Sequence, residues 1–158
     1  MGMTNAEHAE ETRSKESGAE ILLVEDDPGD AEFALRALQQ SGFGHRVAHV
    51  KDGIDALDYI GSRGAFARSR PAAAPKLILL DLALKKMSGL HVLRHLKSDE
   101  RTKGIPVVVL TGSMIAIELA ESYKLGVNSY VIKSSDGRKF AGLISEIAHY
   151  WLEINQRP

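Results

Sequence analysis

The sequence predicts an α/β protein with a doubly wound, five-stranded parallel sheet that is covered by five helices. Short runs rich in β-branched and aliphatic residues alternate with longer stretches of helical period from Glu20 onward. Such alternation predicts parallel strands, because a parallel connection needs a crossover, usually a helix, and the crossover is right-handed. Residues 76–80 include four apolar residues in succession, which is typical of a central strand with helices on both faces.

The predicted strands are the short apolar runs themselves. They span residues 21–25, 46–50, 77–81, 107–111 and 129–133. Four of these runs end in a polar or charged residue, and in an open α/β sheet the ligand binds at that end of the strands. The strand ends are therefore the positions to examine for function.

Capping residues and apolar spacing predict a helix after each strand. The first helix has Asp27 at the N-cap and Pro28 at the first helical position, and it ends before Gly42 and Gly44. The expected buried stripe of this helix consists of Phe33, Ala34, Ala37 and Leu38.

The other four helices are predicted from three- and four-residue apolar spacing. The second, about residues 53–60, carries Ile54, Leu57 and Ile60, and the third carries Leu90, Leu93 and Leu96. The fourth spans about residues 115–125, before Gly126. The fifth carries Phe140, Leu143, Ile144, Ile147, Trp151 and Ile154. Tyr150 and Trp151 fit either the core or an exposed interface.

Two segments fall outside this pattern. Residues 1–19 are small, polar and acidic without sustained apolar periodicity, so we expect a disordered acidic tail before a single domain over residues 20–158. Residues 63–75 contain three arginines, two prolines and an alanine run, which is typical of an extended surface loop.

Composition excludes several classes of function. The net charge of −1 gives no electrostatic reason to bind nucleic acid or an anionic membrane, and the longest apolar run is far shorter than the ~20 residues of a membrane span. The absence of cysteine excludes disulfides, thiolate metal sites and a thiol nucleophile. No secretory segment opens the chain, so we expect a cytoplasmic protein.

Acidic and other polar groups gather at the predicted strand ends. They are Glu25, Asp26 and Asp27 after the first strand, Asp81 at the third, Thr111 at the fourth and Lys133 at the fifth. Carboxylates held together repel one another, and a hard cation with oxygen ligands relieves that repulsion. Because the chain has no cysteine, Mg²⁺ is the expected ion.

The same groups suit chemistry on phosphate. Asp81 would be the nucleophile and would need no general base. Lys133 would neutralise developing charge, and the Thr111 hydroxyl would donate to a phosphoryl oxygen.

The chain resembles the receiver domain of two-component response regulators through four motifs in order. These are Leu-Leu-Val-Glu-Asp-Asp at 22–27, Leu-Leu-Asp-Leu at 79–82 with Met-Ser-Gly at 87–89, Val-Leu-Thr-Gly-Ser at 109–113, and Tyr-Val-Ile-Lys at 130–133. The resemblance covers about residues 20–155. It implies a flavodoxin-like fold with strand order 2-1-3-4-5. It also implies phosphorylation of Asp81 by the phosphohistidine of a partner kinase.

The resemblance further implies the metal ligands. Asp26 and Asp81 would bind Mg²⁺ directly together with the backbone carbonyl of Ala83, and Glu25 would bind it through water. A protein of this family is not a classical enzyme, because it catalyses only its own phosphoryl transfer and autodephosphorylation.

Thr111 and Tyr130 match the pair that reorients in this family when the aspartate is phosphorylated. That change alters the surface around the fourth helix, the fifth strand and the fifth helix, and other proteins read it through direct contacts.

Within the family, two segments are most similar to small response regulators paired with phytochrome-type light-sensing histidine kinases. They are Val-Glu-Asp-Asp-Pro-Gly-Asp at 24–30 and His-Tyr-Trp-Leu-Glu at 149–153. This similarity implies a bacteriophytochrome kinase as partner. It also implies a homodimer through the face of the fourth helix, fifth strand and fifth helix. With a tail and a receiver filling the 158 residues, we expect no DNA-binding or catalytic output module.

Three positions depart from the family pattern. Ala83 replaces a polar residue and Lys85 a proline, and Ser134 follows Lys133 where a proline with a cis peptide bond is usual. Ala83 and Ser113 flank the path of the attacking water in the family, so both bear on the rate of dephosphorylation. For Ser134 we expect a trans bond or unusual strain, because a cis bond before a non-proline residue costs about 2.5–4 kcal/mol.

Three other functions fit these residues less well. A phosphatase of the haloacid dehalogenase type needs a second aspartate where this chain has Ala83. A flavodoxin-like electron carrier needs a Ser/Thr/Gly-rich loop where this chain has acidic residues 25–27. A receiver-like scaffold that binds partners without phosphorylation is compatible with the three departures. His91 and His95, one helical turn apart, are interpreted as surface residues and not as metal ligands.

Overall fold

The computed structural model describes residues 19–66 and 74–158. Residues 1–18 of the predicted tail and residues 67–73 of the predicted loop lie outside the described residues. Ala19, also assigned to the tail, is buried, and the beginning of the loop forms a 3₁₀ turn over Gly64–Phe66.

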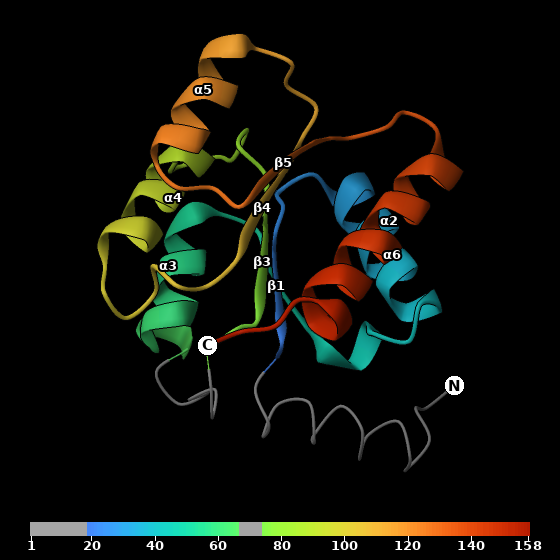
Figure 1. Ribbon diagram of the computed structural model, residues 1–158, viewed down its shortest axis with the longest axis horizontal. Coiled ribbons are helices and arrows are strands. Elements are labelled where there is room, and N and C mark those ends of the chain that lie inside the picture. Colours follow the sequence, from blue (N-terminus) through green and yellow to red (C-terminus); the bar gives the residue numbers. More distant parts are fainter. Residues whose placement is uncertain (1–18, 67–73) are drawn as a thin grey trace.

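Five strands form one parallel sheet in the order β2-β1-β3-β4-β5, which confirms the predicted fold (Figure 1). They are β1 (Ile21–Val24), β2 (Val47–Val50), β3 (Leu77–Leu80), β4 (Val107–Thr111) and β5 (Ser129–Ile132). Strands β1, β3 and β5 end one residue earlier than predicted, so Glu25, Asp81 and Lys133 follow their strands directly. Strand β2 begins one residue late because Arg46 belongs to a 3₁₀ turn over Gly44–Arg46.

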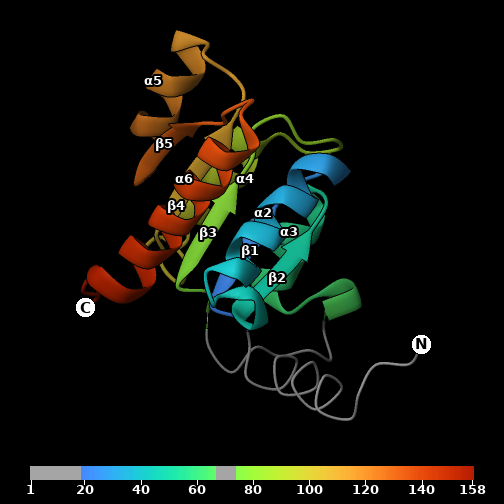
Figure 2. The same ribbon diagram turned by 90° about the vertical axis from the view of Figure 1, so that its right-hand side faces the viewer.

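The helices of the described residues cover both faces of the sheet. They are α2 (Pro28–Gln40), α3 (Gly53–Gly61), α4 (Gly89–Ser98), α5 (Ala116–Lys124) and α6 (Gly137–His149), which a π-helical turn over Tyr150–Ile154 continues. Helices α2 and α6 lie on one face, and α3, α4 and α5 lie on the other (Figures 1 and 2). None of the helices in the described ranges is long and apolar enough to cross a membrane.

The predicted start of α2 is confirmed by its N-cap hydrogen bond and by the position of Pro28. The Asp27 side chain accepts a hydrogen bond from the Asp30 N–H at 2.8 Å, and Pro28 occupies the first turn. After the helix ends, Gly42 has φ +86°, a left-handed conformation that favours glycine. The first turn of α2 is thus fixed directly beside the carboxyl end of β1.

Apolar residues fill two clusters, one on each face of the sheet. Alternate residues of β3 point into opposite clusters, and all four are fully buried, which confirms β3 as a central strand. One cluster includes Leu22, Ile78, Leu80, Val92, Leu93 and Leu96, and the other includes Leu23, Leu77, Leu79, Leu38, Phe140 and Ile144.

Three residues predicted as apolar contacts are instead exposed. Phe33 is 51% exposed because α2 buries the line of Ala31, Ala34 and Leu38. Ile54 is 44% exposed because α3 is turned to bury Ala56 and Tyr59.

Ile154 is 53% exposed because the chain changes from α-helical to π-helical winding after His149, which rotates the apolar face. In the same turn, Trp151 packs partly buried against the core, whereas Tyr150 is 47% exposed. The core interpretation is therefore confirmed for Trp151, whereas an interface role for the exposed Tyr150 stays a prediction.

Candidate functional site

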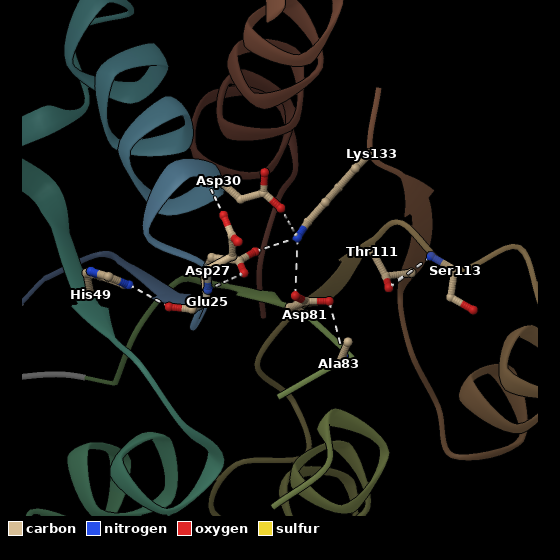
Figure 3. A network of polar contacts seen from close by, with 9 residues as sticks. All are labelled: Glu25, Asp27, Asp30, His49, Asp81, Ala83, Thr111, Ser113 and Lys133. Atoms are coloured by element: carbon tan, nitrogen blue, oxygen red, sulfur yellow. Dashed lines mark hydrogen bonds and ion pairs between the residues drawn. The ribbon is translucent and has the colours of Figure 1, made fainter. Parts of the chain in front are cut away.

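The carboxyl ends of β1, β3, β4 and β5 bring the predicted site residues to one edge of the sheet (Figure 3). Ligand oxygens of Glu25, Asp26 and Asp81 all lie within 4.8 Å of one another, and Lys133 reaches into the same pocket. The convergence predicted from the strand ends is therefore present.

Asp81 and Glu25 are buried because each follows a strand whose four residues are all buried. Burying a carboxylate is costly unless an opposite charge or hydrogen bonds compensate. Lys133 provides that compensation: its Nζ lies 2.6 Å from Glu25 Oε2 and 3.1 Å from Asp81 Oδ2. A further oxygen, Oδ2 of Asp30, lies 2.8 Å from the same Nζ.

Asp30 belongs to the site, although the motif at 24–30 was the only sequence feature that included it. The signal that pointed to the site was position directly after a strand, and Asp30 follows β1 by six residues. Its contact with Lys133 depends on how α2 packs beside the carboxyl ends of the strands. No pattern of neighbouring residues predicts that packing.

Burial and charge perturb the ionisation of two groups in the pocket. Burial raises the pKa of Glu25 to about 7, against the opposing effect of Lys133. Burial by itself would lower the pKa of Lys133, but hydrogen bonds to Asp30 and Glu25 raise that pKa above its usual value. Lys133 therefore stays positively charged, while a cation next to Glu25 would favour its ionised form.

The donor set fits a hard divalent cation. Glu25, Asp26 and Asp81 offer carboxylate oxygens at close range, and no softer ligand is part of the cluster. The Ala83 N–H donates to Asp81 Oδ1 at 3.2 Å, which places this residue beside the carboxylate. The assignment of the Ala83 carbonyl as a ligand stays a prediction.

In the loop that follows Asp81, Gly89 lies close to the backbone of Asp81 and Leu82. The Gly89 N–H donates to the Leu82 carbonyl at 3.0 Å, and a Cβ atom at residue 89 would lie 2.2 Å from the Asp81 carbonyl oxygen. No side chain fits there. Gly89 is part of the Met-Ser-Gly motif at 87–89, from which no structural role could be predicted for it.

Thr111 and Tyr130 both contact Ser113. Thr111 Oγ1 accepts from the Ser113 N–H at 3.3 Å, and the Tyr130 hydroxyl donates to the Ser113 carbonyl at 3.1 Å. The Ser113 hydroxyl also bonds the carboxylate of Glu118, in the first turn of α5. One loop residue thus connects the buried Thr111 with Tyr130 and with α5.

Two smaller expectations can be compared with the structure. His91 and His95 are exposed, with Nε2 atoms 3.1 Å apart, in agreement with a surface position. All described peptide bonds are trans, including the one between Lys133 and Ser134.

Comparison with known proteins points to one family. The profile of the response regulator receiver domain matches residues 21–145. The probable methanogenesis regulatory protein FilR2 of Methanothrix harundinacea is 41% identical over 138 residues, 87% of this chain and 86% of that protein. The response regulator Rcp1 of Synechocystis is 37% identical over 138 residues, 87% of this chain and 92% of that protein.

Solved structures of similar proteins have the same fold. The crystal structure of the phosphorylated cyanobacterial phytochrome response regulator RcpA has a TM-score of 0.81 at 38% identity and covers 89% of this chain and 99% of that one. The crystal structure of the Mn²⁺-bound form of Rcp1 has a TM-score of 0.79 at 36% identity and covers 87% of this chain and 97% of that one.

Proposed function

Because the chain belongs to the response regulator receiver domain family, we propose that it accepts a phosphoryl group on Asp81 from a histidine kinase and signals through contacts with other proteins. The observation that carries this proposal is the pairing of buried Asp81 with Lys133 at 3.1 Å, in the same pocket as Glu25 and Asp26. A buried acid in this position costs the fold free energy that its ion pair with Lys133 has to offset.

In the proposed reaction, a carboxylate oxygen of Asp81 attacks the phosphorus of phosphohistidine. The new P–O bond forms as the P–N bond breaks, and the imidazole nitrogen keeps the electron pair and takes up a proton. Lys133 offers N–H groups to the phosphoryl oxygens, and the hydroxyl of Thr111 donates to one of them. The same residues would serve autodephosphorylation, in which water attacks the phosphorus, the P–O bond to Asp81 breaks, and inorganic phosphate leaves with the Asp81 carboxylate restored.

Mg²⁺ is the proposed cofactor, held by Asp26, Asp81, the carbonyl of Ala83 and, through water, Glu25. When bound, the ion offsets negative charge on the phosphoryl oxygens. The close carboxylate oxygens support a divalent cation at this position, as does the Mn²⁺-bound form of the similar Rcp1.

Thr111 and Tyr130 are the proposed switch. A hydroxyl drawn toward the phosphoryl group changes the bond between Thr111 and the Ser113 N–H. Ser113 in turn holds both Tyr130 and Glu118 of α5, so the change reaches the surface formed by α5 and β5.

Two partners follow from this assignment. A bacteriophytochrome-type kinase is supported by similarity to Rcp1 and RcpA, and the cytoplasm is the proposed place of action.

A second copy of the chain is the proposed partner for the α5–β5–α6 face. Six large apolar residues are exposed on α5, on β5 and in the loop before α5. They are Met114, Ile115, Ile117, Leu119, Tyr123 and Ile132.

The proposed function is tested by incubating the protein with Mg²⁺ and acetyl phosphate and measuring the mass of the intact chain. We expect one acid-stable, base-labile phosphate on the wild type and on Asp99→Asn, which changes a partly exposed acid at the other end of α4. Asp81→Asn should carry none. An unmodified wild type would favour the phosphorylation-independent scaffold, and an equally modified Asp81→Asn would show that another residue is the acceptor.

A further inference from the structure

The contacts of Asp30 point to a role that the proposed chemistry at Asp81 does not include. We propose that Asp30 is a positioning residue that holds the Lys133 ammonium group in the unphosphorylated protein and gives it up to the phosphoryl group on Asp81. This inference rests on the proposed function.

Lys133 uses all of its hydrogen-bonding capacity in the pocket. Its Nζ has three donors, and three carboxylates accept from it: Glu25 at 2.6 Å, Asp30 at 2.8 Å and Asp81 at 3.1 Å (Figure 3). A phosphoryl oxygen that needs Lys133 must therefore replace one of these three acceptors.

The first turn of α2 holds Asp30 in place. Its backbone N–H donates to Asp27 Oδ1 at 2.8 Å, and the positive end of the helix dipole favours a carboxylate in this turn. At its other end α2 is tied to α6 by a bond of 2.9 Å between the hydroxyls of Ser41 and Ser145. Asp30 therefore presents its carboxylate to Lys133 from a rigid element.

Asp30 is the partner that Lys133 can leave at the lowest cost. The side chains of Glu25 and Asp81 are 4% and 6% exposed, whereas that of Asp30 is 44% exposed. A buried Glu25 carboxylate that loses its ion pair is left without water, whereas water can replace the lysine at Asp30, and Asp81 itself carries the phosphoryl group that Lys133 then binds. The exchange at phosphorylation should therefore take place at Asp30.

Competition between Asp30 and the phosphoryl group for Lys133 predicts how the loss of Asp30 changes the rate of phosphorylation. The favourable free energy of the contact between Lys133 and Asp30 is lost when the phosphorylated state forms. The contact therefore slows phosphorylation. Asp30→Asn should therefore accept phosphate from acetyl phosphate about 1.4- to five-fold faster than the wild type, the range set by a partly exposed ion pair.

Asp27→Asn is the matched control. It removes the same charge from the same turn and keeps a residue suited to the N-cap, but the Asp27 side chain does not contact Lys133. We expect the gain in Asp30→Asn to exceed that in Asp27→Asn, and to persist in about 1 M salt, where screening acts within about 3 Å. Equal gains in both variants, loss of the gain in salt, or slower phosphorylation of Asp30→Asn would overturn the inference.

A second readout needs neither metal nor phosphate. In metal-free protein, the Lys133 amine is treated with a trace of acetic anhydride, and its labelling is measured by peptide mass spectrometry. Asp30→Asn should raise labelling of Lys133 a few-fold over the wild type and over Asp27→Asn, because an ammonium group freed from a partner is easier to deprotonate and acylate.

The two outcomes separate this inference from the proposed function. If the wild type takes up no phosphate, the proposed function fails, and with it the role of Asp30. If the wild type is phosphorylated but both asparagine variants label and react alike, the role of Asp30 alone is wrong.

Discussion

Gly89 is the single residue whose replacement should disturb the site most directly. An added Cβ would meet the Asp81 carbonyl oxygen at 2.2 Å and Leu82 Cα at 2.6 Å, and both are backbone atoms that cannot turn aside. Gly89→Ala should therefore lower the free energy of unfolding by about 1–3 kcal/mol, as overpacking does, and displace Asp81. Chemical denaturation and phosphate uptake from acetyl phosphate measure the two effects.

Gly142→Ala provides the control at the same scale. Gly142 lies inside α6 with nothing within 4 Å of an added Cβ, so the substitution should stabilise the protein by about 0.5–1 kcal/mol. If Gly89→Ala unfolds as Gly142→Ala does and retains phosphate uptake, the close approach at Gly89 does not shape the site.

At the scale of an element, α3 depends on its N-cap. The Asp52 side chain accepts from the Asp55 N–H at 2.8 Å and lies 3.2 Å from Lys86 Nζ. Asp52→Ala should cost about 0.5–2 kcal/mol of unfolding free energy near neutral pH, because the first turn of α3 loses its acceptor. Denaturant titration of both proteins measures the difference.

The same cap predicts a dependence on pH. The hydrogen bond from the Asp55 N–H, with help from Lys86, holds the pKa of Asp52 below its ordinary value of 3.8. A carboxyl whose pKa is lower in the folded state stabilises the fold above its unfolded pKa, and that contribution is lost as pH falls through the folded pKa. The stability difference between wild type and Asp52→Ala should therefore shrink below pH 3.8. Asp52→Asn, which caps without titrating, should not share this loss; an equal acid loss in Asp52→Asn would assign the effect to other groups.

At the scale of the whole molecule, α5 leaves most of its residues exposed. Within α5, Ser122 is the buried residue, whereas Ile117 is 75% exposed. If a second copy covers this face, Ile117→Asp should convert a dimer into a monomer, because a buried unpaired charge opposes association. Sedimentation velocity at matched concentrations measures the oligomeric state.

Ile54→Asp is the control for this surface. Ile54 is 44% exposed on α3, which lies on the same face of the sheet as α5 but is separated from it by α4 (Figure 1). It should leave the dimer intact. A wild type that sediments as a monomer, or an Ile117→Asp variant that remains dimeric, would contradict the proposed interface.

The sequence by itself determined the fold and most of the site. Apolar runs such as 77–81 set the strands, and the acids after them marked the pocket, because residues that follow parallel strands meet at one edge. The α2 cap at Asp27 could also be predicted, because it depends on neighbours within three residues.

Tertiary structure alone decided how each helix is rotated and which side chains cross between elements. Phe33 and Ile54 lie at helical spacing yet face solvent, because packing of α2 against the sheet and α6, and of α3 against the sheet and α4, selected a neighbouring line of residues. Asp30 meets Lys133 across 103 residues of sequence. Local patterns report which residues share a face, but the choice of that face and the contacts it makes depend on the packing of whole elements.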